Sequence, residues 1–341
     1  MMPDLKIAVV GAGLMGADHV IRITERIAGA RVSVIVEPDE SRAQAALAHA
    51  PGAMHFTKLE DALAAGVVDA VLIATPGQFH EPVLFPALAA GIPILCEKPL
   101  TPTPEASLRI LEAEQAAGAV VGHKLIQVGF MRRFDAEYIE LRDLIVAGTA
   151  GELLALNCAH RNGMVPDSYT NSMLIEDSVV HEIDVVRFLT DSPIVAIEVK
   201  HGKRNTLSPD HLNEPIFVLL YTESGVLANV EMNVSVQFGY QVKTEAVFQK
   251  GIAEIGRTAG MTLWQDGRYG GVENASFKTR FAAAYDNQIQ RWVNATKRGE
   301  IDGPSAWDGY LASAACAAGV TALTTSELVD VVYVERPAFY N

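Results

Sequence analysis

The stretch LKIAVVGAGLMG, residues 5–16, decides the fold of the first part of this 341-residue chain. Six mostly apolar residues lead directly into the G-x-G-x-x-G pattern of Gly11, Gly13 and Gly16, with Leu14 and Met15 between the last two glycines. In such a pattern the first glycine allows a tight turn, the second lets the backbone approach a pyrophosphate, and the third lets a helix pack against the strand. The following helix presents free N–H groups and its positive dipole end to phosphates. The stretch therefore predicts a strand, a phosphate-binding turn and a helix.

An acidic residue stands where this kind of site needs one. Glu37 lies 21 residues after Gly16, directly behind the apolar run VSVIV of residues 32–36. A carboxylate at that position can bind the ribose hydroxyls of a dinucleotide. Because it would repel the 2′-phosphate of NADP, we expect NAD as the cofactor, while Arg42 leaves NADP as an alternative.

The apolar pattern changes along the chain and predicts two domains. Further runs, VDAVLIA (68–74), IPILC (92–96) and LIQVGF (125–130), alternate with amphipathic stretches, as in a doubly wound parallel sheet covered on both faces. Residues 226–237 instead alternate apolar and polar side chains, which indicates strands buried on one face. We expect an α/β fold with a Rossmann dinucleotide-binding domain at 1–128. An α+β domain at 129–341 follows, with a large, mostly antiparallel, open-faced sheet and helices near 279–298 and 306–325.

Composition excludes several classes of partner. The 27 basic and 41 acidic residues give a formal charge of −14, which repels nucleic acid and anionic membrane surfaces. The three cysteines, Cys96, Cys158 and Cys316, are far apart and predict neither a disulfide framework nor a metal motif. The chain reaches a strand-like run by residue 5 with no room for a signal peptide, so we expect a cytoplasmic protein.

Two polar segments follow apolar runs of the first domain. They are Ala-Thr-Pro at 74–76, with His80 shortly after, and Glu-Lys-Pro at 97–99. Taken alone, a turn that contains proline usually marks only the end of an element, and a lysine after a strand is usually a solvated charge. Because a doubly wound sheet binds its ligands beyond the carboxyl ends of its strands, their shared position favours contacts with cofactor or substrate.

A third set of polar residues lies in the second domain. Asp177, His181 and Asp184 have spacings of four and three, which place them on one face of a helix. A histidine flanked by carboxylates is suited to act as a general base, although a surface ion pair gives the same pattern. The segment HEIDV (181–185) lacks the second histidine of a zinc protease, and we expect no metal.

These residues resemble the Gfo/Idh/MocA oxidoreductases and, among them, the bacterial inositol dehydrogenases. The likeness begins with the four motifs above: the glycine pattern, Ala-Thr-Pro with His80, Glu-Lys-Pro, and the set of Asp177, His181 and Asp184. Narrower likeness lies in VGFMRRFD (128–135), CAHRN (158–162), DSVVHEIDV (177–185), FGY (238–240) and GPSAWDGY (303–310). It spans nearly the whole chain. Two positions depart from the family pattern: Glu37 stands where many relatives carry aspartate, and Ser178 where close relatives often carry threonine.

The resemblance implies NAD-dependent oxidation of a ring hydroxyl of myo-inositol to the ketone. In that reaction His181 would be the general base, Lys98 would polarise the reacting oxygen and Asp177 would align them. The implied cofactor contacts are Gly11, Gly13, Leu14, Met15, Gly16, Glu37, Thr75, Pro76, His80, Glu97 and Lys98. The implied substrate contacts are Lys98, Met131, Arg132, His160, Asn162, Asp177, Ser178, His181, Asp184 and Tyr240. The resemblance also implies a cis peptide between Lys98 and Pro99 and a homotetramer formed through the open sheets.

Three alternatives stay open at the level of sequence. The substrate could be another inositol isomer or a pyranose sugar, because isomers differ by only about 1–3 kcal/mol for each mispaired buried group. Some relatives use NAD transiently to cleave a glycosidic bond. A non-catalytic sensor of NAD or sugar is the third, and it would be expected to lose the base or the lysine, both of which are present.

Overall fold

The structure is a computed structural model that describes residues 3–257 and 259–341. Its contacts divide the chain into two compact units. The first unit consists of Met1–Phe130, Tyr285–Ser313 and Val334–Asn341, and the second of Met131–Ala284 and Ala314–Tyr333. Part of the range expected for the second domain, residues 285–313 and 334–341, thus packs within the first unit.

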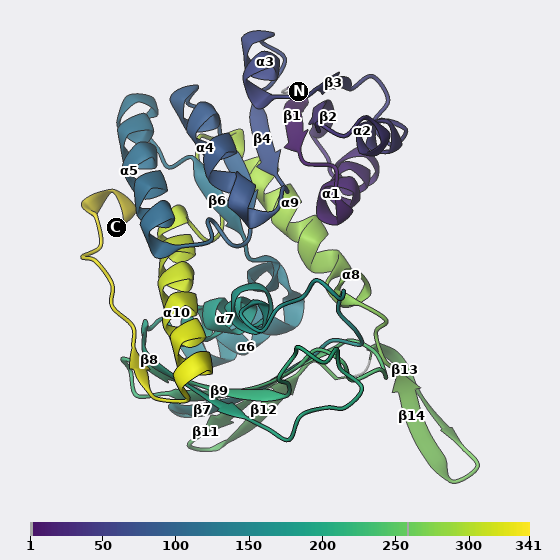
Figure 1. The fold of residues 1–341 in the computed structure, drawn as a ribbon, viewed down its shortest axis with the longest axis vertical. Helices are drawn as coiled ribbons and strands as arrows, with labels where there is room; N and C mark the ends of the chain where they lie inside the picture. Colours follow the sequence, from purple (N-terminus) through teal and green to yellow (C-terminus); the bar gives the residue numbers. More distant parts are fainter. Residues whose placement is uncertain (1–2, 258) are drawn as a thin grey trace. The chain divides into compact units, whose positions relative to one another are not determined.

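The first unit contains a six-stranded parallel sheet in the order β3-β2-β1-β4-β5-β6 (Figure 1). This order confirms the predicted doubly wound Rossmann sheet. Its strands are β1 (Leu5–Val10), β2 (Ala30–Val36), β3 (Met54–Phe56), β4 (Ala70–Ile73), β5 (Ile94–Glu97) and β6 (Ile126–Gly129). Every predicted apolar run supplies a strand, whereas β3, which has only three residues, was not predicted.

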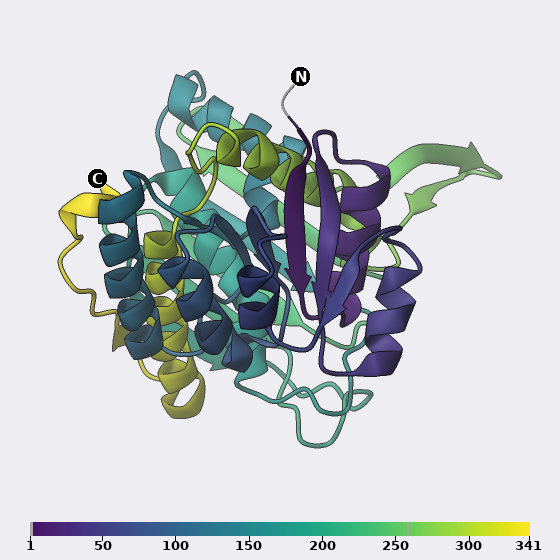
Figure 2. The same ribbon diagram turned by 90° about the horizontal axis from the view of Figure 1, so that it is seen from above.

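Helices lie on both faces of this sheet (Figure 2). They are α1 (Leu14–Glu25), α2 (Glu40–Leu47), α3 (Leu59–Ala64), α4 (His80–Ala89) and α5 (Pro104–Val121). Side-chain caps start two of them, because Asp39 accepts from the N–H of Arg42 and Thr103 from the N–H of Ala106. The sheet order places β2 and β3 on one side of β1 and β4, β5 and β6 on the other. Because connections between parallel strands are normally right-handed, the two halves of the sheet send their helices to opposite faces.

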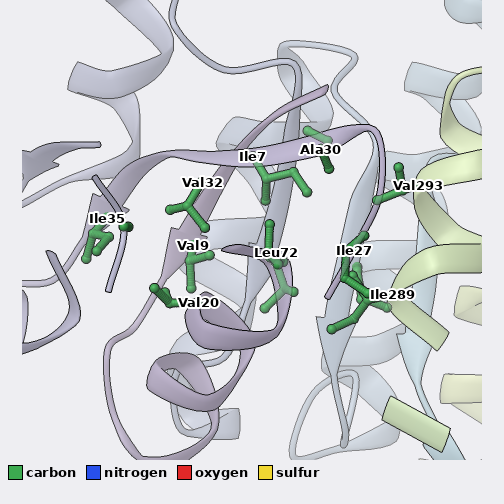
Figure 3. Close-up of a cluster of buried hydrophobic side chains, with 14 of the residues drawn as sticks. Ile7, Val9, Val20, Ile27, Ala30, Val32, Ile35, Leu72, Ile289 and Val293 are labelled. Atoms are coloured by element: carbon green, nitrogen blue, oxygen red, sulfur yellow. The ribbon is translucent and has the colours of Figure 1, made fainter. Parts of the chain in front are cut away.

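A late helix completes the core of the first unit. Helix α9 (Ala282–Thr296) contributes Ile289, Trp292 and Val293 to the buried cluster around β1, β2 and α1. Figure 3 shows Ile289 and Val293 beside Ile27, close to the end of the sheet where Ala30 lies. The sheet therefore owes part of its cover to a segment more than 250 residues away in sequence from Ile27.

The second unit contains a seven-stranded, mostly antiparallel sheet in the order β12-β11-β7-β10-β9-β8-β15, in which only β7 and β10 pair in parallel within the described residues. Its strands are β7 (Leu153–Arg161), β8 (Ile194–His201), β9 (Ile216–Thr222), β10 (Leu227–Asn233), β11 (Gln241–Phe248), β12 (Gly251–Ile255) and β15 (Val329–Asp330). A separate hairpin is formed by β13 (Ala259–Gln265) and β14 (Arg268–Val272). This sheet confirms the predicted fold class.

Helices of the second unit cover one face of its sheet (Figure 1). They are α6 (Ala136–Ala147) and α7 (Val180–Thr190). The unit also contains the short helix α8 (Phe277–Arg280), and α10 (Ala306–Thr325) begins in the first unit and ends in the second. The predicted alternation over 226–237 is confirmed for β10, where Ala228, Val230 and Met232 are buried. The strand ends at Asn233, because the backbone then turns so that Val236 donates to the carbonyl of Asn162.

The three cysteines are free and buried. Within the described residues no helix has the length and hydropathy to cross a membrane.

Candidate active site

Of the three glycines in the turn after β1, only one leaves room for a ligand. Gly11 has φ of +89°, and a Cβ there would lie 2.9 Å from the nitrogen of Thr75. A Cβ on Gly16 would lie 1.8 Å from the carbonyl oxygen of Gly11, so this glycine is needed for close packing of α1. A Cβ on Gly13 would meet nothing within 4 Å. Gly13 and the start of α1, where Leu14 is exposed, thus offer free space and helix N–H groups to an anion.

Glu37, directly after β2, is tied to this turn. Its carboxylate accepts from the N–H of Ala12 (2.8 Å), from the N–H of Asp39 (3.0 Å) and from Arg42 (2.7 Å). Burial alone would raise the pKa of Glu37, but the hydrogen bonds from Arg42 and the two amides outweigh it and lower the pKa. A carboxylate has about four acceptor positions. The lowered pKa means that Glu37 is ionised at neutral pH. Since three acceptor positions are used, it can accept from one further hydroxyl.

A pocket of about 640 Å³ opens beside these groups within the first unit. Gly11, Gly13, Glu37 and Thr75 line it, together with apolar side chains that include Phe79. The hydroxyl of Thr75 is buried and has no hydrogen-bond partner in the part of the chain that the structure describes. The free space at Gly13, the unpaired hydroxyl and the apolar wall fit the phosphates, sugar and base of a dinucleotide.

His80 holds the two polar loops of the first unit together. Its buried ring contacts the carbonyl oxygen of Thr75 through Nε2 and that of Pro99 through Nδ1, both at 2.8 Å. The Sγ of Cys96 lies 3.4 Å from Nδ1, and burial lowers the pKa of His80. Both ring nitrogens thus face the backbone, and a contribution of His80 to cofactor binding would come through the positions of these loops.

The loop of Lys98 is fixed by a partner that the sequence did not reveal. The side chain of Glu97 contacts Nε2 of His19 at 2.7 Å and accepts from the N–H of Lys98 at 3.2 Å. His19 is fully buried on α1, so this pair joins the first helix to the loop after β5. The peptide between Lys98 and Pro99 is cis, as the resemblance implied.

In the second unit, the segment of Asp177 and His181 is helical but not uniformly α-helical. Asp177 lies in a π-helical segment, Leu174–Val179, and His181 lies in the first turn of α7. His181 is 8% exposed, and Asp177 is half-buried. Such wide turns are rare and often occur at functional sites.

Ser178, a predicted substrate contact, is bonded to a tyrosine. Its hydroxyl lies 2.7 Å from the hydroxyl of Tyr169, which also donates to the carbonyl of Met173 at 2.6 Å. Burial and then the negative charge of Asp177 raise the pKa of Tyr169. Tyr169 therefore stays protonated and supports the π-helical segment from one side.

Asp184, one turn after His181, is bound by an arginine. Its two carboxylate oxygens lie 2.6–3.1 Å from the Nε and Nη2 of Arg133, and Arg187 approaches to 4.0 Å. Asp184 is 1% exposed, and such a buried carboxylate requires a paired cation. No local pattern marks Arg133 as a site residue, because 51 residues separate it from Asp184.

A third buried network connects α7 to β7. Arg132, which is buried beside Met131, pairs with Glu182, and the other carboxylate oxygen of Glu182 lies 3.0 Å from Nδ1 of His160. The ring of Tyr240 packs edge-on against His160, with centroids 5.9 Å apart. Burial raises the pKa of Tyr240 to about 12, so its hydroxyl stays protonated. Glu182 was not among the predicted site residues, although it directly follows His181.

Asn162, just beyond the end of β7, is a further polar group with spare capacity. Its backbone pairs with Asn233 and Val236, while its side-chain oxygen is buried without a partner among the described residues. The second unit therefore brings together most of the predicted substrate contacts, in and around α7 and β7. Lys98 and the predicted cofactor contacts belong to the first unit. No group of three or more His, Cys, Asp or Glu side chains suited to a metal occurs in the described parts of the chain.

Both units of the chain match one known protein family. Residues 5–125 match the model of the GFO/IDH/MocA oxidoreductase family, NAD-binding Rossmann fold, and residues 138–254 match the C-terminal domain of that family. A protein named inositol 2-dehydrogenase from Leifsonia xyli subsp. xyli is 58% identical, with 99% of this chain and 98% of that protein covered. One of the same name from Corynebacterium glutamicum is 57% identical over the whole length of both.

A solved structure agrees over the whole chain as well. It is the myo-inositol dehydrogenase from Lactobacillus casei in complex with NAD(H) and myo-inositol, which is 31% identical with a TM-score of 0.94 and covers 99% of this chain and 100% of that one. Together with the two matched domains and the relatives of full length, this places the chain in a family: it belongs to the GFO/IDH/MocA oxidoreductases, with an NAD-binding Rossmann fold in its first unit.

Proposed function

We propose that this protein oxidises a ring hydroxyl of myo-inositol to the ketone, with NAD as the oxidant. The observation that carries the proposal is the match of full length, at 58% and 57% identity, to relatives named inositol 2-dehydrogenase. The Lactobacillus casei enzyme, named for the same substrate and solved with NAD(H) and myo-inositol, supports it at 31% identity.

The first unit would hold the cofactor. The turn at Gly11, Gly13 and Gly16, with Leu14 and Met15 at the start of α1, would bind the pyrophosphate. Glu37 would accept a ribose hydroxyl at its remaining position, and its negative charge favours NAD over NADP. Thr75, Pro76 and the loop of Glu97 and Lys98, held by His80 and His19, would surround the reactive end. Bound NAD supplies the acceptor for the hydride that leaves the oxidised carbon.

Three side chains would carry the chemistry. His181 takes the proton of the reacting hydroxyl as general base. Lys98 donates to the same oxygen and stabilises the negative charge that develops on it. Asp177 aligns the base. The hydride leaves the reacting carbon, and the proton leaves the hydroxyl group on that carbon. The loss of both converts the alcohol to the ketone.

The remaining substrate contacts would divide into two kinds. Asn162 has a side-chain oxygen without a partner among the described residues, and His160 has one ring nitrogen, Nε2, without one, which suits both residues to bind hydroxyl groups directly. Arg132, Ser178 and Asp184 have partners of their own, and they would shape the site around Met131 and Tyr240. A polyol needs such a ring of donors and acceptors, because each of its buried hydroxyls must be paired.

We also propose a division of labour, with residues 1–128 carrying the cofactor and 129–341 carrying the substrate and the contacts between subunits. The face of the seven-stranded sheet opposite α6 and α7 presents Phe217 and Leu227, at 38% and 37% exposure. A homotetramer formed through this face would bury them.

The substrate proposal is tested by NADH formation. Purified protein is supplied with NAD or NADP and, in turn, with myo-, scyllo- and chiro-inositol and glucose. We expect the highest kcat/KM with myo-inositol and NAD. A higher kcat/KM with another polyol would contradict myo-inositol as the substrate. Binding of NAD without release of NADH from any polyol would contradict the proposed oxidation.

A further inference from the structure

Glu182 is a buried carboxylate with no role in the reaction described so far. It lies in the first turn of α7, next to the proposed base, and is 1% exposed. One of its oxygens pairs with Arg132 and the other faces Nδ1 of His160 at 3.0 Å. A buried anion is tolerated only when such partners compensate it.

His160 has one ring nitrogen occupied and one free. Its ring is 3% exposed, on β7, between Tyr240 (centroids 5.9 Å apart) and His181 (6.4 Å). Nδ1 has two neighbours, Glu182 at 3.0 Å and Nη2 of Arg132 at 3.3 Å. Nε2 has no hydrogen-bond partner in the described part of the chain. Nε2 is therefore the atom that this histidine can offer to a ligand.

The two neighbours of Nδ1 make opposite demands on its proton. Arg132 can only donate, which would require a lone pair on Nδ1, and the ionised carboxylate of Glu182 can only accept, which requires an N–H. Burial works to raise the pKa of Glu182, but Arg132 and His160 outweigh it and lower the pKa to about 2. The carboxylate is thus ionised, and it is the closer neighbour. Both contacts involve a charged partner, so the shorter one, to Glu182 at 3.0 Å, outweighs the 3.3 Å contact with Nη2 of Arg132.

We propose that Glu182, itself anchored by Arg132, is a positioning residue that holds His160 in its Nδ1–H tautomer. Nε2 then presents a lone pair and works as a hydrogen-bond acceptor for one hydroxyl of the substrate. This role rests on the proposed function, because it assumes a polyol as the ligand. It makes the position selective for a group that can donate: a hydroxyl binds, and an ether or a C–F group at the same place does not.

Nitrogen-15 spectroscopy of the wild-type protein tests the tautomer without any substrate. The protein is labelled with ¹⁵N-histidine, and the signal of His160 among the nine histidines is assigned by its loss in His160→Gln. We expect a protonated Nδ1 and an unprotonated Nε2 at neutral pH. A signal from the Nε2–H tautomer, or from a ring protonated at both nitrogens, overturns the proposal. Since no polyol is present, this result does not depend on whether the protein oxidises inositol.

Glu182→Gln tests the cause. Arg132 can only donate, so it takes the amide oxygen of the new side chain, and the amide N–H₂ then faces Nδ1 and moves the proton of His160 to Nε2. We expect this change of tautomer together with an increase of about tenfold in KM for the polyol, the loss of one good hydrogen bond, and no change in KM for NAD. The matched control is Glu254→Gln, which changes a glutamate paired with Arg257 at the sheet edge. It leaves the tautomer of His160 and the KM for the polyol unchanged. An unchanged tautomer in folded Glu182→Gln overturns the proposal; if that variant does not fold, the wild-type spectrum decides.

Discussion

His181 has the surroundings expected of a general base: it is nearly buried, in the first turn of α7, and follows a π-helical segment that carries Asp177. We expect His181→Ala to lower kcat by about 100-fold or more, because general bases contribute about that much. NAD affinity should hardly change, since His181 belongs to the second unit and the glycine turn to the first. Steady-state kinetics and NAD titration measure the two effects.

The control is His49→Ala, which changes an exposed histidine just after the end of α2. This variant should keep full activity. A loss of NAD affinity in His181→Ala as large as the loss of turnover would contradict the assignment of His181 as the base.

We propose that Glu37 and Arg42 together set the choice between NAD and NADP. Glu37 now holds Arg42 at 2.7 Å, so removing the carboxylate frees a guanidinium for the 2′-phosphate. We expect Glu37→Ser to raise the ratio of kcat/KM for NADP over NAD by at least about tenfold, the gain typical of one charge-assisted contact. The double variant Glu37→Ser with Arg42→Ala should lose this gain. A gain that survives without Arg42 would show that repulsion by Glu37 alone sets the preference.

At this scale the sequence predicted the residues with recognisable spacing and missed their partners. The glycines and Glu37 follow a pattern that physical chemistry dictates locally. His19, Arg133 and Glu182 carry no such pattern, because their partners lie 22 to 78 residues away and only the fold brings them together. Burial of a charged side chain also has no local signature, since its cost is met by a distant partner.

Among the elements, α7 is joined to its surroundings by a buried ion pair that should be sensitive to acid. The pKa of Glu182 is lowered from 4.5 to about 2 in the folded protein, so the unfolded chain binds the proton more readily. The stabilisation is therefore complete above about pH 4.5 and is lost as the pH falls toward 2. We expect Glu182→Gln to lower the free energy of unfolding by about 3–5 kcal/mol at neutral pH, as for other broken buried pairs.

That difference between Glu182→Gln and the wild type should shrink as the pH is lowered from 4.5 to 3, which denaturant unfolding at several pH values can measure. A constant difference over this range would mean that the carboxylate of Glu182 has an ordinary pKa.

The period of the apolar pattern predicted most elements, and short or bent elements escaped it. The run at 5–10 became β1 without any change of bounds, because Ile7–Val10 are buried and the only polar residue of the run, Lys6, lies near its start. Strand β3 has three half-buried or exposed residues and so no apolar run. The π-helical segment before α7 could not be predicted, because its wide turn keeps the same residue types as an α-helix.

On the scale of the whole molecule, the open face of the seven-stranded sheet should carry the contacts between subunits. Phe217 on β9 and Leu227 on β10 are large, apolar and more than one-third exposed on strands that pair directly. We expect the double variant Phe217→Lys with Leu227→Lys to convert the proposed tetramer into smaller species, because charges would then be buried without partners. Light scattering after size exclusion measures the mass. Val120→Lys, at an apolar site on α5 that is 86% exposed, is the matched control.

The return of the chain to its first unit was beyond prediction from sequence. Helix α9 was predicted as a helix, and its apolar Ile289, Trp292 and Val293 indicate a buried face. Nothing in that face specifies the partner, because apolar contacts are not directional. Its place beside β1 and α1 follows only from the completed sheet.

The central claim, that one carbon of the inositol ring loses its hydride to NAD, is tested most directly with deuterated substrate. The protein is given NAD and myo-inositol that carries deuterium on its ring carbons, and the released cofactor and the product are analysed by mass spectrometry. We predict one deuterium in each NADH released and a ketone that has lost one deuterium. Unlabelled NADH, or a product of unchanged mass with no NADH released, would contradict the account.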